Sequence, residues 1–245
     1  MTPKKAPLSD SAPDTTTRTD DDVDDVGMVE AIDDGGVKAG GRTPRDEEPE
    51  MPVEAEDQEM IRSDFCGHVV GIGASAGGLE ALEQLFDAMP SGSGAAFVVV
   101  QHLSPDHKSL MANLLARHTS MPVVTVRDAM EIEAETIYLI PPGNLMTISE
   151  GQLRLSPKNP KALSLPIDLF FSSLAREFRD RCIGVILSGT GSDGTRGSVA
   201  INDAGGLLLA QDPESAKFDG MPRSVIATGL VDEILPAETL GRRIK

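Results

Sequence analysis

A serine lies at the centre of a glycine-rich turn in residues 69–79, whose sequence is VVGIGASAGGL. The run reads as a buried strand, a tight turn and the start of a helix, and its GASAG segment matches the G-x-S-x-G pattern of a nucleophile elbow around Ser75. Glycines on both sides allow the strained backbone that lifts a hydroxyl above a sheet. The unpaired N–H groups and positive end of the following helix point at the same place. Ser75 is therefore a candidate oxygen nucleophile.

The same turn also fits the dinucleotide-binding fingerprint G-x-G-x-x-A, through Gly71, Gly73 and Ala76. That function requires an acidic residue at the end of the second strand, where it binds the ribose hydroxyls. The strand predicted over residues 95–100 runs instead into Gln101 and His102. The sequence therefore favours hydrolysis over dinucleotide binding.

A histidine and an aspartate follow two further predicted strands. His102 follows residues 95–100, and Asp193 lies in the loop LSGTGSDG (187–194) after a strand predicted over 182–187. Imidazole accepts a serine proton near neutral pH, and a carboxylate fixes the imidazole tautomer. We expect Ser75, His102 and Asp193 to form a catalytic triad. Its chain order, Ser-His-Asp, differs from the Ser-Asp-His order of the common α/β-hydrolases.

Each of these residues also has an ordinary structural interpretation. Ser75 and Asp193 are residue types that cap the N-terminus of a following helix, and His102 is compatible with a strand end. Their joint position at one sheet edge, two of them in glycine-rich loops, favours catalysis. We expect no metal site, because the other histidines lack acidic partners at metal-ligand spacing, and the chemistry requires no cofactor.

Strand-like and helix-like segments alternate from residue 68 onward. The apolar runs FVVV (97–100) and IGVIL (183–187) do not alternate with polar residues, which is typical of strands buried on both faces of a parallel sheet. The sequence predicts an α/β fold, a doubly wound, mostly parallel sheet with helices on both faces. Predicted strands cover 68–72, 95–100, 123–125, 136–140, 182–187, 206–210 and 229–234, and predicted helices cover 78–88, 109–118, 167–178, 195–203 and 221–228. Residues 145–155 predict a β-hairpin, followed by an irregular connection over 156–166.

Charge divides the chain into two parts. Residues 1–66 hold 19 Asp and Glu against 7 Lys and Arg, with one aromatic residue and no sustained apolar period. Such a segment cannot bury enough apolar surface to fold, so we predict a disordered acidic tail over 1–66 and a folded domain over 67–245. The tail's charge is that of a solvated segment, although a basic partner would also be attracted to it.

Composition excludes several classes of function. A formal net charge of −17 argues against nucleic-acid partners and against binding to anionic membranes. The sequence contains no apolar run long enough to span or insert into a membrane, and no signal peptide. Its two cysteines, Cys66 and Cys182, show no disulfide framework, which favours a cytoplasmic setting.

The motifs together resemble the catalytic domain of the chemotaxis protein-glutamate methylesterases, the CheB family. The resemblance rests on GASAGG (73–78), QH (101–102), PPG (141–143), LSGTGSDG (187–194), AGG (204–206), AQ (210–211) and GMPR (220–223), in that order. It implies a doubly wound catalytic domain over 67–245 and a triad matching Ser75, His102 and Asp193. It also implies hydrolysis of glutamyl methyl esters on chemoreceptor helices, with release of methanol, and in some members deamidation of receptor glutamines.

The resemblance also implies which groups bind the oxyanion and which proteins are the partners. The family's backbone donor matches Thr190, and the N–H of Ala76 is a second candidate by geometry. Members in simple chemotaxis systems usually have threonine at the position of Ala76 and methionine at the position of Thr190, so rate and substrate are the properties most open to change. Expected partners are a methylated chemoreceptor or related signalling protein and, because A-S-A-G-G resembles versions joined to them, methyltransferase or sensor-kinase components.

Two further expectations concern regulation and the alternative function. Residues 1–66 are too short and too acidic to form the receiver domain that usually precedes this catalytic domain, so control by aspartyl phosphorylation is not predicted for this chain alone. The alternative to an esterase is a non-catalytic or slow module that binds receptor or partner helices in the same cleft.

Overall fold

The computed structural model describes residues 65–102, 110–159, 161 and 164–244. The predicted acidic tail lies outside these residues, except for its last two. Phe65 packs edge-on against Phe178, with ring centroids 6.4 Å apart, and its carbonyl accepts a hydrogen bond from Arg181 Nη1. The contacts of the folded domain therefore begin at least as early as Phe65.

A parallel sheet forms the centre of the domain, as predicted. Among the described residues it has seven strands in the order β10-β9-β8-β1-β2-β5-β3, and every neighbouring pair is parallel. The strands are β1 (Val69–Ala74), β2 (Ala96–Gln101), β3 (Val123–Thr125), β5 (Ile137–Leu139), β8 (Cys182–Ile186), β9 (Leu207–Gln211) and β10 (Glu233–Leu235). Every residue of β1 is buried, which explains its apolar run without alternation.

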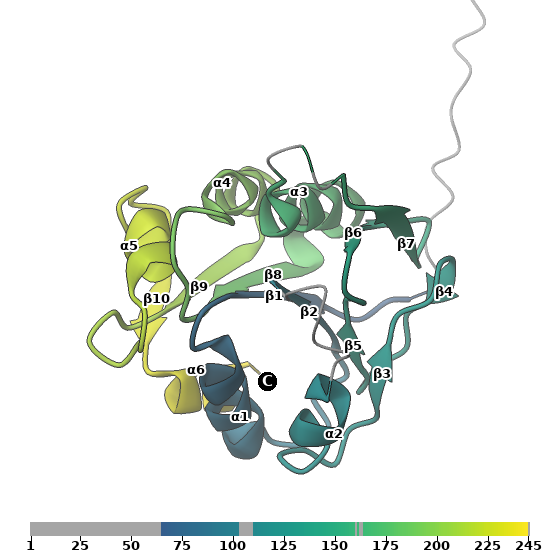
Figure 1. Ribbon diagram of the computed structural model, residues 1–245, viewed down its shortest axis with the longest axis horizontal. Helices are drawn as coiled ribbons and strands as arrows, with labels where there is room; N and C mark the ends of the chain where they lie inside the picture. The colour runs from purple at the N-terminus through teal and green to yellow at the C-terminus, as the bar shows by residue number, and fades with distance from the viewer. Residues whose placement is uncertain (1–64, 103–109, 160, 162–163, 245) are drawn as a thin grey trace, which may run out of the picture. The chain divides into compact units, whose positions relative to one another are not determined.

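Helices cover both faces of this sheet, as Figure 1 shows. Helices α1 (Gly78–Ala88), α2 (Met111–Leu115) and α6 (Ala237–Arg243) lie on one face, and α3 (Pro166–Phe178), α4 (Thr195–Asp203) and α5 (Gly220–Ile226) lie on the other. A single 3-10 turn, η1 (Arg179–Arg181), follows α3. Each face has its own apolar core, with Leu82, Leu85 and Phe86 of α1 on one side and Phe170, Phe171 and Leu174 of α3 on the other. The doubly wound α/β fold predicted from sequence is confirmed.

A second, smaller sheet lies beside α3. The predicted hairpin is present as β6 (Asn144–Ser149) and β7 (Gln152–Pro157), and β4 (Met130–Glu131) pairs with β7 to give three antiparallel strands. The buried Ser173 hydroxyl accepts a hydrogen bond from Ile148 N at 3.0 Å, which joins α3 to β6. This contact fixes the small sheet against the helix that also reaches the active site.

Helix α6, strand β4 and the turn η1 were not predicted, and the strand predicted over 229–234 is present only as β10, Glu233–Leu235. Helix α6 contains Gly241, a residue that disfavours helix, but an added Cβ there would lie 2.0 Å from Leu85 O. Glycine is therefore needed for α6 to pack against α1. Strand β4 is too short to carry a period, and the helix predicted over 109–118 covers only Met111–Leu115, with residue 109 outside the described set. Within the described residues, no helix combines the length and apolar character needed to cross a bilayer.

The order of the strands determines where a ligand can bind. After β1 the chain passes through α1 to β2 on one side, whereas β8 pairs with β1 on the other side. The strand order thus reverses at β1, and crevices at the carboxyl ends of strands around such a point bind ligands in open α/β sheets. Ser75, His102 and Asp193 follow β1, β2 and β8, so all three lie at this edge.

Candidate active site

The three side chains singled out from sequence form one continuous hydrogen-bonded chain. Ser75 Oγ lies 3.2 Å from His102 Nδ1, and His102 Nε2 lies 2.7 Å from Asp193 Oδ2. The residues are 27 and 91 positions apart in sequence, and the sheet brings them together. The structure therefore places the predicted nucleophile, base and carboxylate at distances suited to proton transfer.

The contact with Asp193 determines which imidazole nitrogen can act as a base. A carboxylate oxygen only accepts, so Nε2 carries the proton that it donates to Asp193. Nδ1 is then unprotonated and faces the Ser75 hydroxyl, from which it can accept a proton. The two nitrogens exchange the roles they have in the chymotrypsin-type triad, but the logic of nucleophile, base and orienting carboxylate is the same.

Asp193 is anchored by the N-terminus of a neighbouring helix. Its Oδ2 accepts a hydrogen bond from Ile167 N at 3.0 Å, and its Oδ1 accepts one from Asp168 N at 3.0 Å. Both N–H groups belong to the first turn of α3, which has no internal acceptor for them. The side chain is only 3% exposed, so backbone dipoles rather than water surround the charge. These bonds fix the carboxylate beneath the histidine ring.

The helix-capping alternatives for Ser75 and Asp193 are wrong. The N-cap of α1 is Gly77 and that of α4 is Gly194, and neither helix receives a side-chain capping bond there. Gly77 takes φ 71°, a conformation that suits glycine. Asp193 does bind helix N–H groups, but those of α3 rather than those of the helix that follows it.

Two backbone N–H groups beside Ser75 remain available to an incoming oxygen atom. Those of Ala76 and Thr190 donate no hydrogen bond to other described residues. The neighbouring N–H groups of Ser75 and Gly189 are occupied, by Ser188 O at 3.0 Å and by Phe218 O at 2.9 Å. The occupied pairs hold the two loops together, and the N–H groups of Ala76 and Thr190, the donors expected from sequence, remain open to a ligand.

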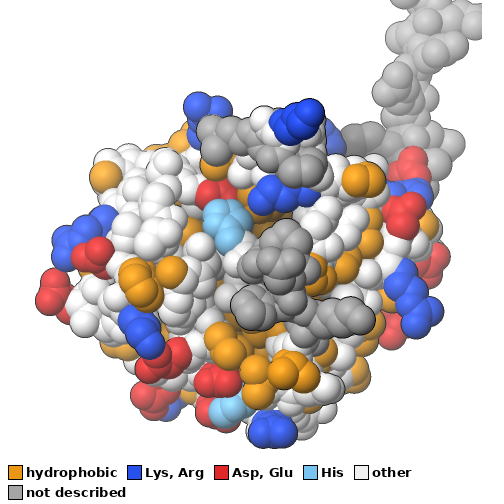
Figure 2. Space-filling view, in the orientation of Figure 1, with side chains coloured by type: hydrophobic (Ala, Val, Ile, Leu, Met, Phe, Trp, Pro, Cys, Tyr) orange, Lys and Arg blue, Asp and Glu red, His pale blue; other side chains and the backbone are white. Residues whose placement is uncertain are grey.

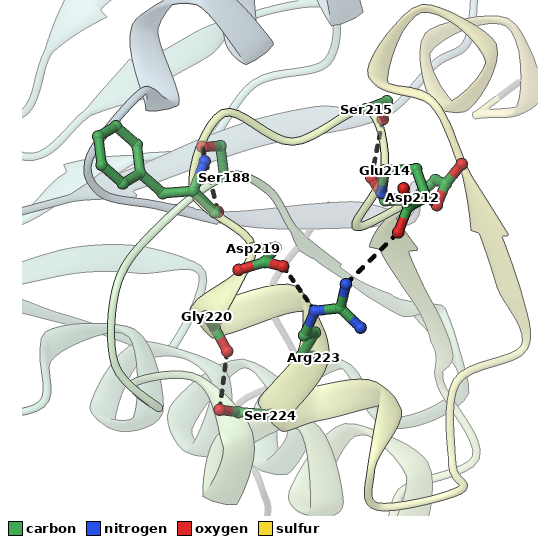
Figure 3. Close-up of polar contacts among 9 residues, drawn as sticks. Ser188, Asp212, Glu214, Ser215, Asp219, Gly220, Arg223 and Ser224 are labelled. Atoms are coloured by element: carbon green, nitrogen blue, oxygen red, sulfur yellow. Dashed lines mark hydrogen bonds and ion pairs between the residues drawn. The ribbon is translucent and has the colours of Figure 1, made fainter.

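The loop between β9 and α5 packs against the turn that carries Ser75, and sequence analysis did not identify its anchor. Ser188 Oγ donates to Ala76 O at 2.8 Å and accepts from Phe218 N at 3.0 Å. Figure 3 shows Ser188 and, in the same loop region, the Arg223 guanidinium between Asp219 and Glu214. Ser188 thus fixes the loop against the turn that carries Ser75. Its only sequence signal is its place in the LSGTGSDG motif.

A cleft beside the histidine gives access to the reacting atoms. His102, Gln101, Pro142 and Lys158 contribute to its walls. The His102 side chain is 31% exposed. Figure 2 shows histidine side chains at the surface of the face drawn. The buried Gln101 Oε1 has no hydrogen-bond partner among the described residues. A separate pocket of about 320 Å³ lies near Gly77, and neither Ser75 nor His102 is among its lining residues, whereas His102 lines the cleft.

No metal centre is suggested by the part of the chain that the structure describes, in which no group of three or more His, Cys, Asp or Glu residues could hold a metal ion. Ser75, His102 and Asp193 are instead joined to one another and to backbone N–H groups. The arrangement suits nucleophilic attack by a serine hydroxyl on a carbonyl carbon.

Comparison with known proteins shows the family of the chain. A family model described as CheB methylesterase matches residues 70–244. A protein named protein-glutamate methylesterase/protein-glutamine glutaminase 2, from Anaeromyxobacter dehalogenans, is 35% identical over 178 residues, which make up 72% of this chain and 52% of that protein. A similarly named protein from Geobacter sulfurreducens is 36% identical over 181 residues, or 72% of this chain and 49% of that protein.

Two further matches extend the comparison. A Rhodobacter capsulatus protein described as an uncharacterized 104.1 kDa protein is 60% identical over 131 residues, or 54% of this chain and 14% of that protein. The crystal structure of the Thermotoga maritima CheB methylesterase catalytic domain superposes with a TM-score of 0.66 and 29% identity, covering 73% of this chain and 97% of that one. The chain spans about half the length of the curated methylesterases it matches. By its family match, its relatives and its fold, the chain belongs to the CheB methylesterase family.

Proposed function

We propose that residues 67–245 hydrolyse glutamyl methyl esters on a chemoreceptor or related signalling protein, with Ser75, His102 and Asp193 as the catalytic triad. The observation that carries the proposal is the hydrogen-bonded chain from Ser75 Oγ through His102 to Asp193. Family membership supports the substrate class, because relatives carry the name protein-glutamate methylesterase.

In the acylation step, His102 Nδ1 takes the proton of Ser75 while Oγ attacks the δ-carbonyl carbon of the esterified glutamate. The negative charge that develops on the carbonyl oxygen is stabilised by the N–H groups of Ala76 and Thr190. The imidazolium, held by Asp193, then gives its Nδ1 proton to the departing methoxy oxygen. The bond from carbon to that oxygen breaks, and methanol leaves an acyl-enzyme.

Water then hydrolyses the acyl-enzyme, with water in place of Ser75 as the attacking group and Ser75 as the leaving group. His102 Nδ1 takes a proton from water, the hydroxide attacks the acyl carbon, and Ser75 leaves with the proton from the imidazolium. The product is an unmodified glutamate. A glutamine side chain can enter the same sequence with ammonia as the leaving group, and we include this deamidation in the proposal because relatives are also named protein-glutamine glutaminase.

The test is methanol release from methylated chemoreceptor membranes by the native chain and by Ser75→Ala. We expect release by the native chain and a loss of about 10⁴-fold or more in the variant, since the nucleophile is removed. Ser156→Ala is the matched control, because it removes one hydroxyl from an exposed position on β7. No release by the native chain, with membrane binding intact, would contradict the proposal and favour a receptor-binding module.

A further inference from the structure

Two helix N-termini lie beside the active site and approach each other closely. Helices α3 and α4 both begin at the carboxyl edge of the sheet, on the same face (Figure 1). At Gly197, in the first turn of α4, an added Cβ would lie 2.5 Å from Phe171 Cβ and 3.0 Å from Asp168 Cα. No larger side chain fits, so the starts of the two helices are in direct contact.

At this contact, an aspartate at the start of each helix accepts N–H groups from the other helix. Asp193 lies just before α4, yet it accepts the N–H groups of Ile167 and Asp168 in α3. Asp168 lies in the first turn of α3, yet its Oδ1 accepts the N–H of Gly197 in α4 at 2.9 Å. Asp193 thus caps α3, the helix that contains Asp168, and Asp168 caps α4, the helix that follows Asp193. The backbone N–H of Asp168 is itself one of the groups bound by Asp193. The loop that ends in Asp193 is tied to α3 at both of these points.

Stability alone does not explain a carboxylate at position 168. The Asp168 side chain is 7% exposed, and none of the described lysines or arginines forms an ion pair with it. Burial raises the pKa of the Asp168 carboxyl, and the negative charge of Asp193 raises it further, against the opposing hydrogen bond from Gly197. An ionised carboxylate at this buried position opposes folding. Its role therefore lies in the group that its oxygen atoms hold in place, which is the N–H of Gly197.

We propose that Asp168 is a positioning residue for the reaction, because its carboxylate holds the start of α4, and with it the Asp193 loop, in register with His102. This inference rests on the proposed function. Removing the Asp168 side chain frees the Gly197 N–H and the first turn of α4, only four residues after Asp193. Asp193 then loses its fixed place beneath the imidazole, while the cleft that receives the substrate keeps its walls.

The first experiment measures kcat and KM for methyl-ester hydrolysis by the full chain. We expect Asp168→Ala to lower kcat about 10- to 100-fold with KM nearly unchanged, as for a small misplacement of a catalytic group. Asp168→Asn should restore most of kcat, because its amide oxygen can still accept the Gly197 N–H. Ser173→Ala is the control, since it removes a buried α3 side chain that binds Ile148 N away from Asp193. It should lower Tm and leave kcat unchanged.

The second experiment observes the Nε2 proton of His102 by NMR, which requires no substrate. A proton in a short bond to a carboxylate resonates far downfield, and its loss in His102→Gln assigns it. We expect this resonance in the native chain, Asp168→Asn and Ser173→Ala, and its broadening or loss in Asp168→Ala.

The two experiments separate the inference from the proposed function. If the native chain releases no methanol but the resonance responds as expected, the esterase proposal fails and the positioning role stands. If Asp168→Ala keeps both the native kcat and the resonance, the positioning role is overturned and the esterase stands. The positioning role is also overturned if kcat falls in proportion to the loss of Tm, and by the same proportion, in both Asp168→Ala and Ser173→Ala. Absence of the resonance from the native chain would do the same, because no ordered bond would exist to be positioned.

Discussion

Replacing Asp193 by asparagine changes one atom and removes hydrogen-bonding capacity that the site needs. The carboxylate accepts three bonds, from Ile167 N, Asp168 N and His102 Nε2. An asparagine has a single acceptor oxygen, and its NH₂ group only donates. With the amide oxygen toward Ile167, the NH₂ group faces the Asp168 N–H. With the amide reversed, the NH₂ group faces both the Ile167 N–H and His102 Nε2.

The magnitude of the effect on stability follows from this count. In either orientation at least one buried N–H loses its acceptor, at a cost of about 1–3 kcal/mol. Losing the negative charge at the start of α3 adds about 0.3–2 kcal/mol. We therefore expect Asp193→Asn to lower the free energy of unfolding by about 1–5 kcal/mol.

The effect on catalysis is larger, because the reversed amide inverts the histidine tautomer. An NH₂ group facing His102 Nε2 requires an unprotonated nitrogen there, so the proton moves to Nδ1. Nδ1 then donates to Ser75 and cannot take its proton. A triad held in the wrong tautomer loses about 10⁴-fold in kcat.

Methanol release and urea unfolding measure both effects in one preparation. Asp232→Asn is the control, since its exposed carboxylate accepts a single N–H, from Leu208 at 2.8 Å, which an amide oxygen can still accept. It should retain native stability and rate. An Asp193→Asn variant that keeps kcat within tenfold of native, or that unfolds at the native urea concentration, would refute the reasoning.

Three further predictions concern other parts of the domain. Gly77→Ala should lower the free energy of unfolding by about 1–2 kcal/mol through its φ of 71°, and by more because the new Cβ would lie 2.8 Å from a hydroxyl oxygen. Gly92→Ala is the control, because Gly92 has φ 85° and nothing within 4 Å of an added Cβ, so the variant has the backbone strain without the crowding. If both variants lose the same free energy of unfolding in urea, crowding at Gly77 is unimportant. Burial raises the pKa of Cys182 to about 12, so a thiol reagent at pH 8 should modify exposed Cys66 in the native chain and Cys182 only after denaturation. Equal native rates would contradict this. Burial raises the pKa of Glu135, but hydrogen bonds from the 92–94 turn outweigh it and leave the pKa below its ordinary 4.5. Its contribution to stability is therefore present at neutral pH and lost as pH falls below about 5. Tm should decline less steeply with acid in Glu135→Gln, and identical slopes would count against that assignment.

The sheet and its main helices could be predicted from sequence because their burial is periodic or continuous. Helices α1 and α4 and strand β3 have the predicted bounds. The residues of the site could be predicted because polar side chains interrupt apolar strands at one end. A serine, a histidine and an aspartate at three such ends indicate a common edge, and the structure joins them at 3.2 and 2.7 Å.

Contacts that depend on how two elements meet could not be predicted in this way. Asp168 reads as an ordinary acidic residue in the first turn of a helix, and only the packing of α4 brings Gly197 within 2.9 Å of it. The orientation of the His102 ring has the same origin, because it is set by side chains 27 residues before and 91 residues after it. The need for glycine at position 241 of α6 likewise arises only from the backbone of Leu85 in α1, which lies against it.

The order in which the site residues occur along the chain has a consequence for how the protein folds. Ser75 and His102 follow adjacent parallel strands, but Asp193 lies 91 residues beyond His102, after the small sheet, α3 and β8 in the chain. Contacts across such long separations form slowly, because the loop must close before the contact can stabilise it. During refolding, β1 and β2 can pair before the carboxylate is available. Recovery of serine reactivity should therefore follow recovery of helical signal, and the rate of its return reports the arrival of β8 at the centre of the sheet.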